Sequence, residues 1–242
     1  MRRPRQLVLP LPVREALGRE DYYVSRSNGL AVALLDDWAG WPNGKMILVG
    51  PRGAGKTHLA HVWAKETGAV IVPARDLPGA DIPTLARAPV CVEDADRIAT
   101  DRLAEEALFH LHNLALAERR ALLLTASSPP RQWGLALPDL RSRMEATQTA
   151  TLPDPDDDLL GAVIAKTLND RGCLPAPEVI LYLVRHMPRR FAAALALVDA
   201  LDAQAMGRPK GITRALARDV LTRMTPTLDA PRTPRSPDET RN

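Results

Sequence analysis

The sequence predicts an α/β fold in which a parallel five-stranded sheet is followed by an all-helical C-terminal part. A glycine-rich loop at residues 50–57 lies between a short apolar run and a helical pattern, as a strand–loop–helix unit requires. Further short apolar runs alternate with helical segments as far as residue 152, which favours parallel strands joined by helices. Beyond residue 158, every periodic segment has helical spacing.

The composition fits this fold and excludes several classes of protein. The chain has 242 residues, 45% of them hydrophobic but only 4% aromatic, which suits a helix-rich α/β protein better than an all-β protein. The net charge of +3 is compatible with a nucleic acid nearby, although the scattered arginines form no dense basic run. No apolar run is long enough to span a membrane, and the arginine-rich start lacks the apolar core of a signal peptide. We therefore expect a cytoplasmic protein.

The cysteines and histidines predict neither a disulfide framework nor a metal site. Cys91 lies in an apolar run and Cys173 near a helix end, as expected of reduced cytosolic thiols. His58 with His61, and His110 with His112, have no cysteines or carboxylates at ligand spacing, so we expect packing or surface roles for them.

The first residues contain the run Gln6-Leu-Val-Leu-Pro-Leu-Pro12. Its prolines exclude a helix, so residues 1–22 should form an extended N-terminal segment. The leucines either pack on the domain or dock in an apolar groove of another protein as a linear peptide. Periodicity alone favours the first alternative. In the second, the anchors would be Leu7, Leu9 and Leu11.

A helix over residues 29–38, with Asn28 at its N-cap, leads to the central motif. The run 46–49 reads as a buried strand, and the loop after it fits G-x-x-x-x-G-K-[ST] at every position. In such a loop the backbone N–H groups bind phosphate oxygens, the lysine reaches the β- and γ-phosphates, and the hydroxyl binds Mg²⁺. The alternative is an ordinary glycine-rich turn. We expect nucleotide contacts from Gly50, Pro51, Arg52, Gly53, Ala54, Gly55, Lys56 and Thr57.

Two carboxylates end a later strand. After a helix over 56–66 and a strand over 69–72, the apolar run that begins at Val90 closes with Glu93 and Asp94. We expect the neighbouring strand of the sheet to deliver these acids, one orienting Mg²⁺ through water and the other polarising the attacking water. The alternative is a pair of surface acids at a strand end.

A helix over 101–118 and a strand over 121–125 follow. The strand leads to Ser127, whose hydroxyl could reach the γ-phosphate, although polar residues commonly follow strands. A short helix over 140–145 presents Arg141 and Arg143 either as a solvated basic face or as a finger that stabilises a transition state. Residues 150–152 are the last strand candidate.

The C-terminal part is helical over 158–171, 176–186, 189–206 and 213–224. We expect a domain boundary near Asp154 and a disordered tail over 225–242, which has four prolines and hardly any apolar content. Arg189 and Arg190 open an apolar helix that could fold over a bound nucleotide and report its γ-phosphate.

Together, residues 6–224 resemble the AAA+ ATPases of the initiator clade, and within it the Hda family, the regulatory inactivators of the replication initiator DnaA. Residues 6–11, Gln-Leu-Val-Leu-Pro-Leu, resemble the Q-L-x-L-P-L motif by which that family binds the sliding clamp of the replicative polymerase. Residues 22–28 resemble the initiator segment that lines the adenine pocket, which adds Asn28 to the expected nucleotide contacts.

Two further segments carry the resemblance. Residues 123–143 are similar to the region from sensor I to the arginine finger, with Ser127 at sensor I and Arg143 at the finger. Residues 188–195 are similar to the sensor II helix, with Arg189 at the sensor arginine. The resemblance therefore implies an AAA+ P-loop NTPase core over 23–153 and a helical lid over 154–224.

The resemblance implies a negative regulator of replication initiation. Bound to the DNA-loaded clamp, the protein would promote hydrolysis of DnaA-bound ATP through Arg143. The implied cofactors are ATP or ADP and Mg²⁺, with Thr57 and Glu93 as metal ligands. The implied partners are DnaA and the clamp, with DNA reached through the clamp and no membrane; self-association stays open. Clamp contacts would come from Gln6, Leu7, Leu9 and Leu11.

One departure from the family concerns hydrolysis, and two other functions stay open. The family usually has Asp where this chain has Glu93, so we expect weak or no intrinsic ATPase activity.

An autonomous AAA+ motor or loader ATPase in replication or recombination would instead use its own ATP, with Asp94 activating water. A truncated, DNA-binding relative of the initiator is the third reading; against it, we expect the chain to lack the helix-turn-helix and oligomerisation domains of DnaA.

Overall fold

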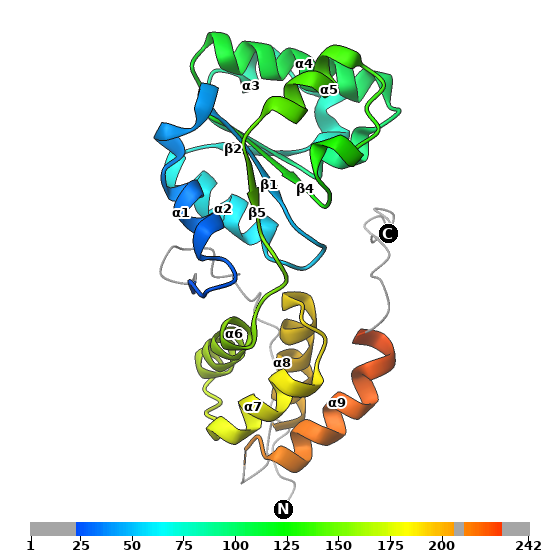
Figure 1. Cartoon of the computed structure of the whole chain (residues 1–242). Coiled ribbons are helices and arrows are strands. Elements are labelled where there is room, and N and C mark those ends of the chain that lie inside the picture. Colours follow the sequence, from blue (N-terminus) through cyan, green and yellow to red (C-terminus); the bar gives the residue numbers. More distant parts are fainter. Residues whose placement is uncertain (1–22, 206–210, 229–242) are drawn as a thin grey trace, which may run out of the picture.

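The computed structural model describes residues 23–205 and 211–228. These residues form a sheet flanked by helices, followed by a bundle of helices joined to the sheet by the segment after its last strand (Figure 1). The proposed clamp-binding residues Gln6, Leu7, Leu9 and Leu11 lie outside the described residues, as does the tail 229–242.

The sheet has five strands in the order β2-β3-β4-β1-β5, and every neighbouring pair is parallel. The predicted parallel five-stranded sheet is therefore confirmed, with strand ends shifted by about one residue. The strands are β1 (Lys45–Val49), β2 (Val70–Pro73), β3 (Val90–Glu93), β4 (Leu122–Ala126) and β5 (Thr149–Thr151).

One expectation about the sheet is wrong. β3, which ends with Glu93, is not the neighbour of β1, because β4 lies between them. β1 pairs with β4 from Lys45 opposite Leu122 to Val49 opposite Ala126, and β3 pairs with the other edge of β4. Polar groups that follow β4 therefore lie between the glycine-rich loop and the acids of β3.

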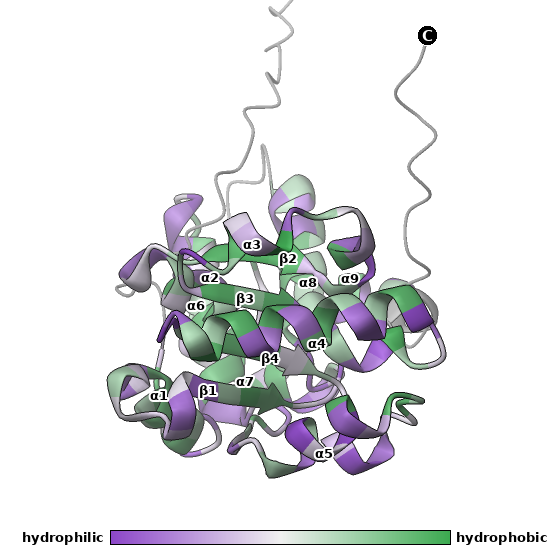
Figure 2. Ribbon diagram, turned by 90° about the horizontal axis from the view of Figure 1, so that it is seen from above, coloured by the Kyte–Doolittle hydropathy of each residue, from purple (hydrophilic) through white to green (hydrophobic). Residues whose placement is uncertain are grey.

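Helices cover both faces of the sheet because alternate residues of each strand point to opposite faces. Met46 and Leu48 of β1 pack with one group of helices, whereas Ile47 and Val49 pack with the other. Seen from above, apolar strands run between helices whose outer surfaces are more polar (Figure 2). The first face carries α1 (Gly29–Asp36) and α2 (Lys56–Thr67); the second carries α3 (Ile82–Leu85), α4 (Arg102–Ala117) and α5 (Pro138–Ala146).

Short 3₁₀ helices complete the part of the fold that contains the sheet. They are η2 (Trp38–Gly40), η3 (Pro42–Gly44), η4 (Ala74–Gly79), η5 (Ala95–Ile98) and η6 (Pro130–Gln132). η5 follows β3 directly, so the backbone turns sharply after the acids, and Asp94 adopts a left-handed conformation with φ 54°. Aspartate tolerates this conformation better than most residues.

The C-terminal helices enclose an apolar cluster of their own, which includes Leu160, Leu183, Leu197 and Val220. The helices are α6 (Asp157–Asp170), α7 (Pro177–His186), α8 (Phe191–Ala205) and α9 (Arg214–Leu228). Two predicted boundaries are wrong: α8 begins at Phe191 and not at Arg189, and α9 continues through residues 225–228, which we expected in the tail. Backbone hydrogen bonds extend a helix past its last apolar position, which apolar content alone does not reveal.

A buried carboxylate holds α4, η5 and α5 together. Glu105 of α4 is 1% exposed. Its Oε1 accepts hydrogen bonds from the backbone N–H groups of Thr100 at 3.1 Å and Ala136 at 3.0 Å, and its Oε2 accepts one from Leu137 at 2.7 Å. Leu137 is the N-cap residue of α5, so Glu105 fixes where that helix starts.

We predict that Glu105→Ala lowers the free energy of unfolding by about 3 kcal/mol, because three backbone N–H groups lose a buried acceptor. Urea denaturation measures the change. The control is Glu106→Ala, which removes only a partly exposed ion pair to Arg102 and should leave stability nearly unchanged. Similar effects from the two substitutions would contradict this role of Glu105.

Candidate functional site

The glycine-rich loop leaves β1 with a geometry that only glycine permits at three positions. A Cβ added to Gly50 would lie 2.2 Å from the carbonyl oxygen of Leu152, so the two chain segments are in backbone contact. Gly53 and Gly55 have φ angles of 87° and 97°, which residues with a side chain rarely adopt. The glycines predicted from the motif therefore shape the loop itself.

Lys56, the first residue of α2, lies under this loop. Its ammonium donates to the carbonyl oxygens of Gly50 at 2.6 Å and Pro51 at 3.0 Å. An ammonium has three donors, so one remains for a ligand. Burial lowers the pKa of Lys56, while the charges of Asp94 and Asp96 act to raise it. The acids after β3 therefore lie within electrostatic reach of the loop.

The N-terminus of α2 has no side-chain cap. Its N-cap residue is Gly55, and the first turn contains no acidic residue to complement the helix dipole. The first N–H groups of a helix have no partner within the helix, and the positive end of the dipole attracts anions. The loop and helix together therefore form the arrangement that binds a phosphate group.

Two buried carboxylate oxygens near the loop have no hydrogen-bond partner among the described residues. They are Oε1 of Glu93 and Oδ1 of Asp96. Buried carboxylate oxygens are ordinarily paired with a donor or a cation. The donor set therefore fits a cation at the end of β3.

Asp94 differs from these two residues. Its carboxylate contacts the guanidinium of Arg97 at 3.3 Å, and both side chains are nearly half exposed. Its backbone N–H donates to the hydroxyl of Thr125 in β4 at 3.1 Å. Asp94 is therefore fixed by its backbone and paired with a neighbouring arginine.

Asp96 is a functional candidate that the sequence reasoning missed. Its Oδ2 accepts a hydrogen bond from the backbone N–H of Ser127 at 2.8 Å. This bond joins the acids after β3 to the expected sensor I residue after β4. The run Glu-Asp-Ala-Asp offered three similar carboxylates, and only the tight turn of η5 brings the third one back to the sheet.

Asn28 occupies the N-cap position of α1 but does not cap the helix with its side chain. It is 1% exposed; its Oδ1 accepts from the N–H of Ser25 at 2.8 Å, and its Nδ2 donates to the carbonyl oxygen of Tyr23 at 2.9 Å. The expected N-cap position of Asn28 is therefore confirmed, but its side-chain amide bonds these backbone groups and not the helix. Asn28 therefore shapes the segment 23–28, the expected adenine-pocket segment.

The helical part touches the loop through the start of α8. The N–H of Phe191 donates to the carbonyl oxygen of Gly53 at 3.2 Å. A Cβ added to Gly53 would contact the side chain of Arg190, and one added to Gly55 would lie 2.9 Å from the Phe191 ring. Arg189, the expected sensor arginine, instead pairs with Asp157 of α6 at 2.8 Å. Arg190 is thus the arginine packed against the loop.

Asp156 makes a second contact between the helical part and the sheet part. Its Oδ1 caps α6 by accepting from the N–H of Leu159 at 2.8 Å, and its Oδ2 accepts from the N–H of Ser27 at 3.1 Å. One carboxylate therefore fixes α6 to the segment before α1. These hydrogen bonds help to lower the pKa of Asp156, against the opposing effect of burial.

Arg143 lies near the start of the strands, at the opposite end of the sheet from the glycine-rich loop. It belongs to α5, its guanidinium lies 5.2 Å from the centre of the Phe109 ring, and it lines a hollow with Lys45, the first residue of β1. The loop leaves the other end of that strand. The structure therefore does not bring Arg143 to this chain's own loop.

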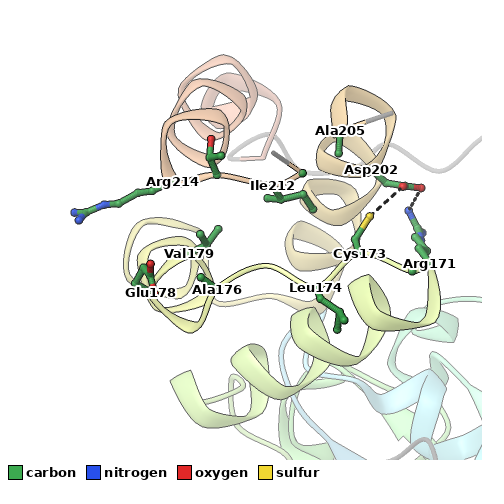
Figure 3. A pocket seen from close by; sticks show the side chains of 13 residues that line it. Arg171, Cys173, Leu174, Ala176, Glu178, Val179, Asp202, Ala205, Ile212 and Arg214 are labelled. Carbon is green, nitrogen blue, oxygen red and sulfur yellow. Dashed lines mark hydrogen bonds and ion pairs between the residues drawn. The ribbon is translucent and has the colours of Figure 1, made fainter. Parts of the chain in front are cut away.

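A larger hollow lies within the helical part (Figure 3). Its volume is about 650 Å³, and Cys173 lies in it beside Asp202, which also pairs with Arg171 at 3.5 Å. Arg214 points away from it (Figure 3). The hollow is separate from the glycine-rich loop, and its rim includes Ala205 and Gly211, which flank residues outside the described ranges.

No group of three or more His, Cys, Asp or Glu side chains within residues 23–205 and 211–228 is arranged to hold a metal ion by itself. In the same ranges, no helix is long and apolar enough to cross a membrane.

Comparison with known proteins places the fold. No protein-family model matches the chain. The structure is similar to domain III of the replication initiation protein DnaA from Thermotoga maritima, with a TM-score of 0.73 at 15% identity over 88% of this chain and 98% of that one.

Two further solved structures have a similar fold. AMPPCP-bound DnaA from Aquifex aeolicus gives a TM-score of 0.67 at 16% identity, over 76% of this chain and 64% of that one, just under two thirds of its length. A mutant of RuvB from Thermotoga maritima gives 0.62 at 17% identity, over 82% of this chain and 68% of that one. The chain therefore has an AAA+-like fold, a parallel five-stranded α/β core with a C-terminal helical region.

The contact between Gly50 and Leu152 leads to a prediction. Gly50→Ala should lower the free energy of unfolding by about 2 kcal/mol or more, because the new methyl group cannot fit against a backbone carbonyl. Chemical denaturation measures it. Gly79→Ala is the matched control, since nothing lies within 4 Å of the Cβ position there. Equal stability of the two variants would show that the loop has room to move away from Leu152.

Proposed function

We propose that the chain binds ATP or ADP in the loop 50–57 with Mg²⁺, and that it acts as a regulator of DnaA. The geometry of the loop is the observation that carries the nucleotide proposal: three glycines without room or conformation for a side chain, an uncapped helix, and a buried lysine with one spare donor. DnaA from Aquifex aeolicus, which has a similar fold, was solved with AMPPCP bound.

In the proposed site, each of the residues described above has a separate role. Backbone N–H groups of the loop and Lys56 bind the phosphates, while the Thr57 hydroxyl and Glu93 hold Mg²⁺, which offsets phosphate charge when bound. The buried carboxylate oxygens of Glu93 and Asp96 that have no hydrogen-bond partner among the described residues support a cation at the end of β3. Asp96 positions Ser127 through its backbone. The segment 23–28 and the start of α8 border the nucleotide.

We predict that Lys56→Ala weakens ATP binding about ten- to a hundredfold, because one charge-assisted hydrogen bond to phosphate is lost. Isothermal titration calorimetry with Mg·ATP measures the dissociation constant. Lys65→Ala, on the exposed face of the same helix, is the control and should bind like the wild type. Undiminished affinity in Lys56→Ala would contradict nucleotide binding at this loop.

The regulatory part of the proposal rests on Arg143. Its guanidinium lies at the far end of β1 from the loop, where it could act on a second molecule but not on this chain's own nucleotide. The ring of Phe109 supports the guanidinium through a cation–π contact, which limits its freedom. Combined with the clamp-binding motif proposed at residues 6–11, this favours an Hda-type regulator that supplies an arginine finger to ATP-bound DnaA.

We predict that the protein accelerates hydrolysis of DnaA-bound ATP only when the sliding clamp is loaded on DNA, because the clamp raises the local concentration of both proteins. Arg143→Ala should lose most of the acceleration, since arginine fingers contribute about 10³–10⁵ in rate. Arg141→Ala, an exposed neighbour on the same helix, should retain it. The measurement is release of labelled phosphate from DnaA-bound ATP.

One control separates clamp docking from nucleotide binding. Exchanging Gln6 and Leu7 for Ala should remove the dependence on the clamp while nucleotide binding stays normal. Rapid turnover of the protein's own ATP, without any effect on DnaA, would instead favour an autonomous motor or loader ATPase. That second candidate gains support from the similar fold of RuvB. It requires Asp94 as the base, a residue that pairs with Arg97 at 3.3 Å.

A further inference from the structure

The amino-terminal edge of the sheet contains a cluster of basic side chains, of which the proposed function uses Arg143 alone. Lys45 comes from β1, His112 from α4 and Arg143 from α5, and together they line a hollow of about 220 Å³. Three separate elements therefore direct basic nitrogen atoms to one place. Asn43 and Gln148 add amide groups to the same lining.

Lys45 and His112 are buried although both are polar. They are 3% and 4% exposed, and the Lys45 ammonium lies 2.9 Å from Nε2 and 3.2 Å from Nδ1 of His112. A neutral imidazole can accept one hydrogen bond from the ammonium but cannot offset its charge. A buried charge without an opposite charge is costly, so such groups are ordinarily paired.

No carboxylate compensates this cluster within the part of the chain that the structure describes. Neither Lys45 nor Arg143 forms an ion pair with an acidic side chain there. Burial and the charge of Arg143 lower the pKa of Lys45 to about 8. Burial, then the charge of Lys45, lowers the pKa of His112 to about 4, with Arg143 acting in the same direction and a hydrogen bond to Asn113 against it.

We propose that Lys45, His112 and Arg143 form a binding site for a phosphate group at the amino-terminal edge of the sheet. Near neutral pH the cluster carries the charges of Lys45 and Arg143, whereas His112 is neutral. A phosphate dianion matches two positive charges, whereas a carboxylate matches one. The lysine and arginine would donate to the phosphate oxygens in charge-assisted hydrogen bonds. This site is independent of the nucleotide loop.

The two sites are well separated along β1. Lys45 begins the strand and Gly50 follows its end, so about 16 Å of extended backbone lies between them. A phosphate at the edge site therefore cannot be the phosphate of a nucleotide held in the chain's own loop. Its source is either free phosphate or a phosphate monoester.

The test is a titration of the full-length protein with inorganic phosphate at constant ionic strength and pH 7, following the ring nitrogens of His112 by NMR. We expect a saturable shift and a rise in the pKa of His112, because a bound dianion stabilises the protonated ring. Lys45→Met should weaken this binding by about tenfold or more, whereas Lys65→Met should not change it. No saturable shift, or an unchanged affinity in Lys45→Met, would overturn the proposal.

Further variants make the test specific. The Lys45→Met variant should fold, because an apolar side chain of similar length replaces a buried cation. Arg143→Gln, at an exposed position, gives an independent second variant. In Lys56→Ala the shift of His112 should persist, which separates this site from the nucleotide loop. Binding of O-phosphoserine as well as inorganic phosphate would show that the site accepts an ester. Binding of inorganic phosphate alone would show that the site prefers the free ion. Equal binding of acetate would contradict the charge argument.

Discussion

The structure depends on the burial of β1 along its whole length. All five residues of the strand are buried, with β4 hydrogen-bonded along one edge and β5 along the other. The middle of such a strand has no exposed side chain with which to bind a ligand. Chemistry is therefore confined to its two ends. The glycine-rich loop continues from one end, and the other end begins with Lys45 beside Arg143.

This arrangement decides how the two sets of charged residues can act. The acids after β3 and the hydroxyl and amide groups after β4 lie at the same end of a parallel sheet as the loop, because all strands point the same way. Arg143 lies at the opposite end of the strands, because α5 leads the chain back to the start of β5. In the proposed regulator, the chain's own nucleotide and the arginine finger would lie at opposite ends of β1. The arginine finger would therefore act on a second molecule.

The sequence predicted the features that depend on local signals. The loop motif and the apolar runs predicted the glycine-rich loop with the helix after it and a parallel five-stranded sheet, because strand–loop–helix units are encoded in neighbouring residues. Features that depend on distant contacts were missed: the strand order, the return of Asp96 to Ser127, and the ion pair between Arg189 and Asp157. The clamp-binding motif at residues 6–11 stays a prediction.

The contact between Phe191 and Gly53 suggests how nucleotide and helical part could influence one another. One hydrogen bond and the packing of Arg190 and Phe191 join α8 to the loop, while Asp156 fixes α6 to the segment 23–28. A ligand shifts such an arrangement only by its different affinity for the two positions of the helical part. The aliphatic stem of Arg190 contacts the loop at Gly53, whereas the guanidinium of Arg189 pairs with Asp157. The exposed ion pair between Arg189 and Asp157 links the residues just before α8 to the start of α6.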